Sequence, residues 1–278
     1  MSTALGRSLN ESSGTSVFLN EPFNMRNGDV DAAAGHVVRA AESLLSSARQ
    51  PVIVLAKSMA RFLTGPVFRA WTDVCSSVVW CIRDPRTQIS SLVTRTANDL
   101  FFGVGSDRLK QGDLLPSHLA AVTEFLQSSE LSTDFSKTGW RAIGAHFADC
   151  AGRRPSWVAD GSLFSRMPDQ FLPYLCSRLG LEFSDRMIDG WEKPFVNVDR
   201  FYYPEYDDAG DAWVKQAATS RGIETTESPP LEDSALPDAL RDHLLTEALP
   251  VYETLMRAFY AQDDLAQYGL EPGRHPRR

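Results

Sequence analysis

Several features that identify common classes of protein are missing from this 278-residue sequence. No apolar run approaches the roughly 18 residues that a membrane-spanning helix needs. The opening residues, MSTALGRSLNESSG, lack the apolar stretch of a signal peptide. There is no GxxxxGK[ST] loop and no GxGxxG motif, so an ordinary ATP-dependent kinase is not expected. These absences together predict a cytoplasmic protein.

Signals for metal binding are also missing. The four cysteines are scattered and form no CxxC pair, which favours reduced, buried thiols over a metal site: Cys75, Cys81, Cys150 and Cys176. The histidines show no metal-ligand spacing, and each is expected to be structural or exposed: His36, His118, His146 and His243.

Basic residues are fewer than acidic residues, and the formal net charge is therefore -8. This balance argues against a general nucleic-acid binder and against attraction to an anionic membrane. It leaves room for a local basic pocket that holds a small anion. The oligomeric state is not predicted by anything in the sequence.

Short apolar runs alternate with longer helical patterns. Strands are predicted in SVFLNEPF, PVIVLAK, SSVVWCIR and PSWVAD, and helices in 29–49, around Gly65-Pro66, in 85–99, within 113–150, in 167–180 and as a pair around Pro250. This alternation predicts a three-layer α/β fold, with a mostly parallel central sheet flanked by helices. The continuous apolar run PVIVLAK predicts a central strand buried on both faces.

One domain is expected over residues 1–260, with a C-terminal tail over 261–278. Within the domain, residues 184–230 are rich in Asp, Tyr, Trp and Pro and read as a lid or cap segment. Its aromatic run FYYPEYDD, with Trp191 and Trp213, has two open interpretations. It lines a pocket for an acceptor molecule, or it packs the cap onto the core.

Right-handed crossovers place the ends of the predicted parallel strands along one edge, where open α/β sheets bind ligands. The stretch IRDPRTQISS lies at such a strand end. Pro85 starts a helix there, so Arg83 lies near free N–H groups and the positive end of a helix dipole. The planar guanidinium of Arg83 suits a phosphate, and Ser91 lies about two turns into the helix. Alternatively, Arg83 pairs with a carboxylate and Ser91 is an ordinary helix residue.

A strand followed by R-D-P-R, with a hydroxyl residue eight positions after the first Arg, resembles the 3'-phosphate-binding element of sulfotransferases. Those enzymes use 3'-phosphoadenosine 5'-phosphosulfate (PAPS). Other stretches resemble the bacterial branch of that family in the same order: STALGRSLNES, VFLNEPF, IVLAKSMARFL, PDQFLPYLCSRLGLEF and LPVYETLMRAF. The resemblance covers nearly the whole chain and implies a P-loop-like α/β fold whose first strand is missing from this sequence.

The resemblance also implies a PAPS site. Arg83 and Ser91 match the family's 3'-phosphate ligands, and Arg86 is a further candidate unless it only faces solvent. Ser2 and Thr3 match the donors that hold the 5'-phosphosulfate. Arg221 and Gly222 match a late Arg-Gly element, or else form an ordinary loop.

Two catalytic residues follow from the same resemblance. Glu21 matches the general base of branches that use Glu instead of His, and an N-cap or an ion pair with Arg26 is its alternative role. Lys57 matches a Lys near the transferred sulfonate, and otherwise it reaches solvent. Related proteins often have a His directly after this Lys, whereas this chain has Ser58. Without that His, the resemblance leaves Glu21 as the expected general base.

The sequence therefore predicts transfer of a sulfonate from PAPS to a hydroxyl of a small-molecule acceptor, such as a bacterial secondary metabolite. The reaction needs no metal. Two alternatives stay open: a catalytically silent binding protein, and a P-loop-like transferase with another phosphorylated donor.

Overall fold

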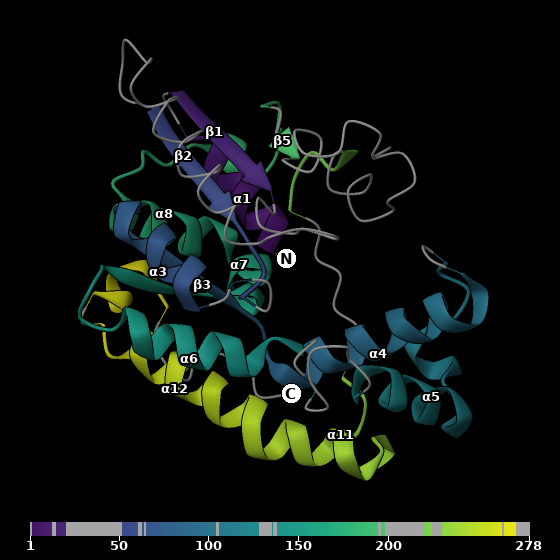
Figure 1. Cartoon of the computed structure of the whole chain (residues 1–278). Coiled ribbons are helices and arrows are strands. Elements are labelled where there is room, and N and C mark those ends of the chain that lie inside the picture. The colour runs from purple at the N-terminus through teal and green to yellow at the C-terminus, as the bar shows by residue number, and fades with distance from the viewer. Residues whose placement is uncertain are drawn as a thin grey trace.

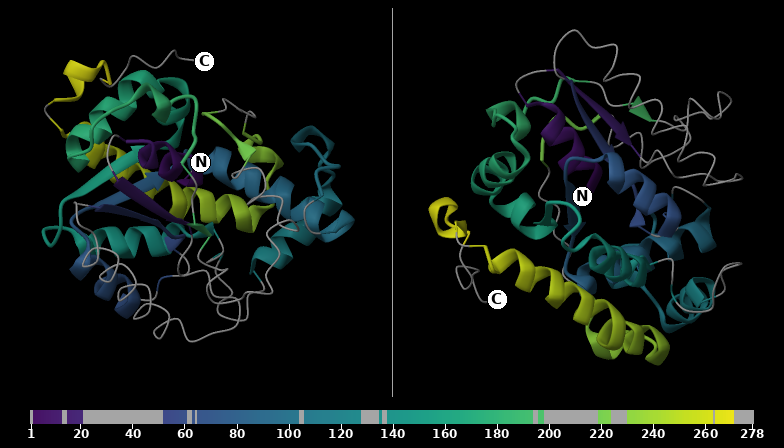
Figure 2. Two further views of the ribbon diagram at one scale, coloured as in Figure 1. Left: turned by 90° about the horizontal axis from the view of Figure 1, so that it is seen from above. Right: turned by 60° about the vertical axis from the view of Figure 1, so that its left-hand side comes forward.

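The computed structural model describes residues 2–12, 15–20, 52–60, 63, 65–103, 106–127, 135, 138–193, 196–197, 219–223, 230–262 and 264–270. Figures 1 and 2 show these residues as coloured ribbons in three orientations.

The described strands form two parallel sheets: β1 (Thr15–Asn20), β2 (Val52–Lys57), β3 (Val78–Ile82), β4 (Ser156–Asp160) and β5 (Val196–Asn197). β1 lies between β2 and β5, and β3 pairs separately with β4. Every one of these pairings is parallel. The predicted α/β fold with parallel strands is therefore confirmed, although the strands are divided between two sheets.

Helices surround both sheets: α1 (Ser2–Asn10), α3 (Gly65–Val74), α4 (Pro85–Phe102), α5 (Pro116–Gln127), α6 (Trp140–Cys150), α7 (Gly161–Arg166), α8 (Pro168–Leu179), α11 (Asp238–His243) and α12 (Leu249–Tyr260). Short 3-10 turns are η2 (Gln111–Asp113), η4 (Asp185–Met187), η6 (Asp233–Ala235) and η8 (Leu265–Tyr268). α1 packs against β1 and β2, whereas α6 contacts α3 and α12 (Figure 1).

A glycine lets α1 approach β1 closely. A Cβ atom at Gly6 would lie 2.3 Å from the ring of Phe18, which is itself fully buried. Leu5 and Leu9 extend the buried face of the helix into the main core. The apolar residues of STALGRSLN recur at helical spacing, so they give α1 one face that packs on the sheet.

Sequence signals at helix ends are confirmed where the structure describes them. Pro85 begins α4, because a missing N–H is harmless in a first turn. α8 ends at Gly180, whose φ of 65° is left-handed backbone that glycine adopts without strain.

The predicted helical pair around Pro250 is a single run with a defect. α11 passes into a π-helical turn (Leu244–Ala248) and then into α12, with Pro250 in the first turn of α12. A proline cannot donate to the preceding turn, and the wider π turn absorbs the lost hydrogen bond. The chain therefore continues in one direction across the proline.

The first part of the expected lid belongs to the core. Met187 and Trp191 are buried, and Val196–Asn197 pair with β1. A carboxylate oxygen of Glu11 accepts hydrogen bonds from the backbone N–H groups of Glu192 and Lys193, at 2.9 and 2.6 Å. This part of the segment is thus bound to the end of α1. Residues 198–218 lie outside the described residues.

The boundary expected at residue 260 is too early. Leu265 and Leu270 are buried in the main core, and the ring of Tyr268 meets that of Tyr174 edge-on. Asp264 also pairs with Arg178 of α8. The packed domain therefore continues to Leu270, and the tail expected over 261–278 begins later.

Two buried histidines make folding sensitive to pH. His146 Nε2 lies 2.9 Å from the carbonyl oxygen of Leu63, and His243 Nε2 lies 2.9 Å from Thr138 Oγ1. Burial lowers the pKa of both imidazoles below the ordinary value of about 6.5. The unfolded chain therefore takes up these protons first, so their contribution is complete above about pH 6.5 and declines as the pH falls below it.

We expect the free energy of unfolding in urea to decrease as the pH is lowered from about 7.5 to about 5.5, by at most about 1.4 kcal/mol per pH unit for each histidine. His146→Phe keeps the ring that stacks on Phe68 but cannot titrate, so its pH dependence should be shallower than that of the wild type. An unchanged slope in both His146→Phe and His243→Phe would contradict this origin.

Candidate functional site

The carboxyl ends of three strands carry ionisable side chains. Lys57 ends β2, Asp160 ends β4, and Arg83 directly follows β3. The charges of Lys57 and Asp160 both act on Cys81 of β3. Burial raises the pKa of its thiol, nearby Lys57 lowers it, and nearby Asp160 raises it. Lys57 at the end of β2 and Asp160 at the end of β4 therefore both lie near Cys81 of β3, and a shared ligand edge stays a prediction.

The first turn of α4 lies directly beside Arg83. The Asp84 side chain accepts a hydrogen bond from the backbone N–H of Arg86 at 2.8 Å and so caps the helix. The Arg86 guanidinium pairs with Asp233 at 3.2 Å, with both side chains partly exposed. Arg86 therefore already has a carboxylate partner, whereas its expected role toward a phosphate stays a prediction.

The two serines in the middle of α4 differ in their surroundings. Ser90 is buried, donates to the Arg86 carbonyl at 2.7 Å and accepts from the backbone N–H of Leu231 at 2.8 Å. Ser91 is exposed. The serine that the phosphate-binding pattern selects is thus the one that remains accessible to a ligand.

Ser2 and Thr3 form the first turn of α1. In Figure 1 the N-terminus lies close to the arrowheads of β1 and β2, and thus at their carboxyl ends. An anion-binding role for these residues stays a prediction.

Arg221 and Gly222 lie beside α1. Gly222 forms an antiparallel bridge with Asp189, and the Arg221 carbonyl accepts from the backbone N–H groups of Gly190 and Trp191 at 2.7 and 2.9 Å. The Arg7 guanidinium of α1 donates to the neighbouring Ser220 carbonyl at 2.8 Å. The Arg221 side chain is exposed. Its expected contact with a 3'-phosphate stays a prediction.

Glu21 lies outside the described residues, as do Trp213 and the aromatic run at 201–208. The preceding residue in the sequence, Asn20, ends β1 and pairs in register with Lys57. Trp191 packs instead of lining an accessible pocket. It is buried, its indole N–H donates to the Met187 carbonyl at 2.9 Å, and Arg7 lies over its ring.

A hydroxyl next to Lys57 has no hydrogen-bond partner within the part of the chain that the structure describes. Ser58 follows β2 directly, and its Oγ atom is buried from solvent. Buried hydroxyl groups in folded proteins are normally hydrogen-bonded, so this one is an exception among the described residues. The hydroxyl of Ser58 can donate a hydrogen bond to an anion at this position.

The structure reveals a pair that the sequence analysis missed. The Tyr252 hydroxyl donates to a carboxylate oxygen of Asp160 at 3.0 Å, and the other oxygen accepts from the Ser162 backbone N–H at 2.6 Å. Asp160 is only 4% exposed. Burial and the adjacent Asp160 both raise the pKa of Tyr252. The sequence contains one signal for this site: Asp160 ends an apolar strand and is followed by Gly161 and Ser162.

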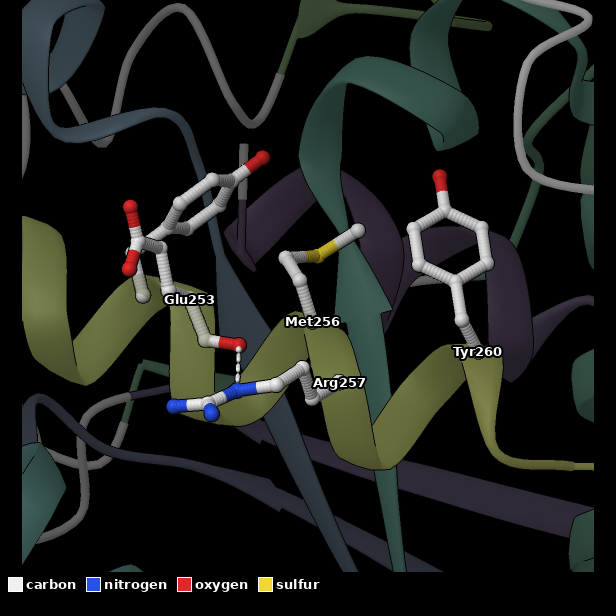
Figure 3. Close-up of a pocket in the computed structure, with 5 residues that line it drawn as sticks. Glu253, Met256, Arg257 and Tyr260 are labelled. Carbon is white, nitrogen blue, oxygen red and sulfur yellow. Dashed lines mark hydrogen bonds between the residues drawn. The ribbon is translucent and has the colours of Figure 1, made fainter.

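Tyr252 also borders an open hollow of about 370 Å³ along α12. Figure 3 shows Met256 and Tyr260 projecting from α12 to the same side, while Arg257 extends back toward Glu253. The Arg257 Nε–H donates to the Glu253 backbone carbonyl at 3.3 Å. Tyr252, Met256 and Tyr260 all line this hollow, and Tyr252 bonds to Asp160 at the end of β4.

We expect Tyr252→Phe to lower the free energy of unfolding by about 1–3 kcal/mol, because it leaves a buried carboxylate oxygen without its donor. Urea denaturation at neutral pH measures this difference. Tyr268→Phe is the matched control, since its contact with Tyr174 is between rings and survives the change. Equal stabilities of the two variants would show that the bond to Asp160 contributes nothing.

No group of three metal-ligating side chains occurs among the described residues. His146 and His243 are structural, as the sequence predicted. No helix in the described part of the chain has the length and apolarity needed to cross a membrane.

Comparisons with known proteins give one distant similarity in shape. No family model and no curated protein matches the chain. A solved structure described as "Sulfotransferase Domain from the Curacin Biosynthetic Pathway" resembles it with a TM-score of 0.38 and 12% sequence identity. The likeness covers 80% of this chain and 75% of that one. At this level the similarity assigns no residue and no substrate.

Proposed function

We propose that this chain is a sulfotransferase that moves a sulfonate from PAPS to a hydroxyl of a small-molecule acceptor. One observation carries the proposal. Lys57 ends β2 and Arg83 lies between the end of β3 and the start of α4, so both lie at carboxyl ends of parallel strands, in a chain whose net charge is -8. Positive groups concentrated at a sheet edge suit a small polyanion.

In this proposal the donor nucleotide binds across the carboxyl ends of the parallel strands. Arg83 and the accessible Ser91 bind the 3'-phosphate, with Arg221 and Gly222 as further contacts. Ser2 and Thr3 hold the 5'-phosphosulfate at the start of α1, where N–H groups and the helix dipole favour an anion. The unpaired Ser58 hydroxyl supports an anion beside Lys57.

The proposed reaction is an in-line displacement. The acceptor oxygen forms a bond to sulfur while the bond from sulfur to the 5'-phosphate oxygen breaks. Glu21 takes the hydroxyl proton, and adenosine 3',5'-bisphosphate leaves as the product. Lys57 stabilises the charge that develops on the leaving phosphate. The pairing of Asn20 with Lys57 supports this assignment, since Glu21 is the residue after Asn20.

Calorimetric titration tests the donor site. We expect adenosine 3',5'-bisphosphate to bind the wild-type chain with micromolar affinity, and adenosine 5'-monophosphate to bind at least about tenfold more weakly, because it lacks the 3'-phosphate that Arg83 holds. Equal affinities for the two nucleotides would point to another phosphorylated donor. Absence of binding for both nucleotides would contradict the proposal.

A further inference from the structure

Large apolar side chains are accessible to solvent at the end of α4, just before α5 and on the outer face of α5. We call five of these residues the hairpin patch, and each is between 42% and 57% exposed: Leu100, Phe101, Phe102, Leu115 and Phe125. α4 contacts α5, and Figure 1 shows the two helices side by side, extending away from the strands. Single apolar residues on a surface are ordinary, whereas a contiguous apolar patch marks a surface that binds another molecule.

The hairpin patch is contiguous. The ring centroid of Phe101 lies 4.7 Å from that of His118, and His118 Nδ1 accepts a hydrogen bond from the Leu115 backbone N–H at 3.2 Å. Phe125 follows His118 by about two helical turns and therefore lies on the same face of α5. The end of α4 and the outer face of α5 thus form one apolar surface.

Two hydrogen bonds hold part of the connection from α4 to α5 against α4. The Asn98 side chain accepts from the Leu109 backbone N–H at 2.8 Å and donates to the Leu109 carbonyl at 2.9 Å. Asn98 is buried, and the guanidinium of Arg108 lies over the ring of Phe102. A surface that is held in place before binding loses less conformational entropy when a partner covers it.

The size of the hairpin patch matches one side of an ordinary protein interface. A large apolar side chain has roughly 200 Å² of surface, so the exposed fractions leave roughly 450 Å² of apolar surface in contact with water. Because about 56–65% of an interface is apolar, this area corresponds to about 700–800 Å² per partner. A stable complex of standard size buries about 800 Å² per partner.

The charges beside the hairpin patch favour a second copy of this chain as the partner. The Lys110 ammonium lies 3.9 Å from the Asp107 carboxylate, and the Asp113 carboxylate accepts from the Lys110 backbone N–H at 2.9 Å. Together with Arg108, this stretch carries equal numbers of acidic and basic side chains. A two-fold axis brings such a balanced surface against itself without net repulsion, whereas an anionic membrane attracts an excess of basic residues.

We propose that the hairpin patch is the contact surface between two copies of this chain, related by a two-fold axis. Each copy contributes α4 and α5, so the contact brings four helices together. α4 has 18 residues, which places its start, beside Arg83, about 27 Å from the patch at its end. The patch is therefore separate from the proposed nucleotide site, and the inference does not depend on the proposed function.

Sedimentation equilibrium of the whole chain between about 1 and 500 μM tests this proposal. We expect a dimer with a dissociation constant of about 1–100 μM, as for interfaces near the lower end of the standard size. Phe101→Glu and Leu115→Glu should each raise this constant at least about tenfold, because each places an unpaired carboxylate in an apolar contact. Val74→Glu is the matched control, since Val74 ends α3, is 48% exposed and lies outside the patch. This control should keep the constant of the wild type.

A wild-type chain that stays monomeric up to about 500 μM would overturn the proposal. Equal weakening by Val74→Glu would do the same, as would an unchanged constant in both patch variants, because the dimer would then use another surface. Binding of the monomer to vesicles of phosphatidylcholine and phosphatidylserine, lost in Phe101→Glu, would assign the patch to a membrane instead. If Phe101→Glu fails to fold, Leu115→Glu decides alone, since Leu115 has the largest exposed fraction in the patch.

Discussion

Replacing Arg83 with alanine is expected to abolish tight binding of adenosine 3',5'-bisphosphate. Arg83 follows β3 directly, beside the first turn of α4, where its guanidinium can donate two parallel hydrogen bonds to a phosphate. Removing one partner of such a charged pair costs about 2–5 kcal/mol, which is at least about 30-fold in affinity. Calorimetry of wild type and variant measures the loss.

Arg95→Ala is the matched control for this experiment. Arg95 lies on α4, the helix that begins two residues after Arg83, and pairs at 3.0 Å with Asp99, which is one turn further along the helix. The control removes the same charge from α4 but leaves the strand end intact, so nucleotide affinity should stay near that of the wild type. Equal losses in the two variants would show a general effect of charge and would remove Arg83 as the specific ligand.

Replacing Glu21 with glutamine is expected to lower turnover by about 10²–10⁴-fold while nucleotide affinity stays unchanged. Glutamine keeps the shape of the side chain but cannot take the acceptor proton. Turnover is followed as release of adenosine 3',5'-bisphosphate from PAPS, with naphthol and simple alcohols as acceptor probes. The split between turnover and affinity separates a base from a binding residue.

Glu253→Gln serves as the control, because Glu253 is an exposed carboxylate on α12 that takes no part in the proposed site. Full activity of Glu21→Gln would exclude Glu21 as the base. Tight nucleotide binding without turnover in the wild type, across all acceptor probes, would favour the catalytically silent alternative.

The sequence predicted local structure well wherever a short stretch contains its own signal. The apolar run before Arg83 forms β3, Pro85 starts α4, and Gly180 ends α8. Each of these outcomes depends on backbone preferences and side-chain periodicity within a few residues. The order of the strand ends is readable for the same reason, and it predicts that Lys57 and Arg83 lie at one edge of the sheet.

Contacts between distant segments were not predictable in this way. Tyr252 meets Asp160 across 92 positions of sequence, and Arg86 meets Asp233 across 147. Neither pair has a spacing or motif that connects its members. The burial of Leu265 and Leu270 depends likewise on the position at which α12 ends. The hydrophobicity of these two residues alone does not say which surface of the domain they cover.

The sequence by itself determined the α/β class, the helix ends marked by Pro85 and Gly180, and the residue types at the strand ends, since these follow from local periodicity and turn chemistry. Only the tertiary structure decided that the described strands form two parallel sheets, with β1 between β2 and β5 and with β3 paired to β4. Strand pairing is non-local. Identical apolar runs suit a central or an edge position, and the crossovers around them choose between the two.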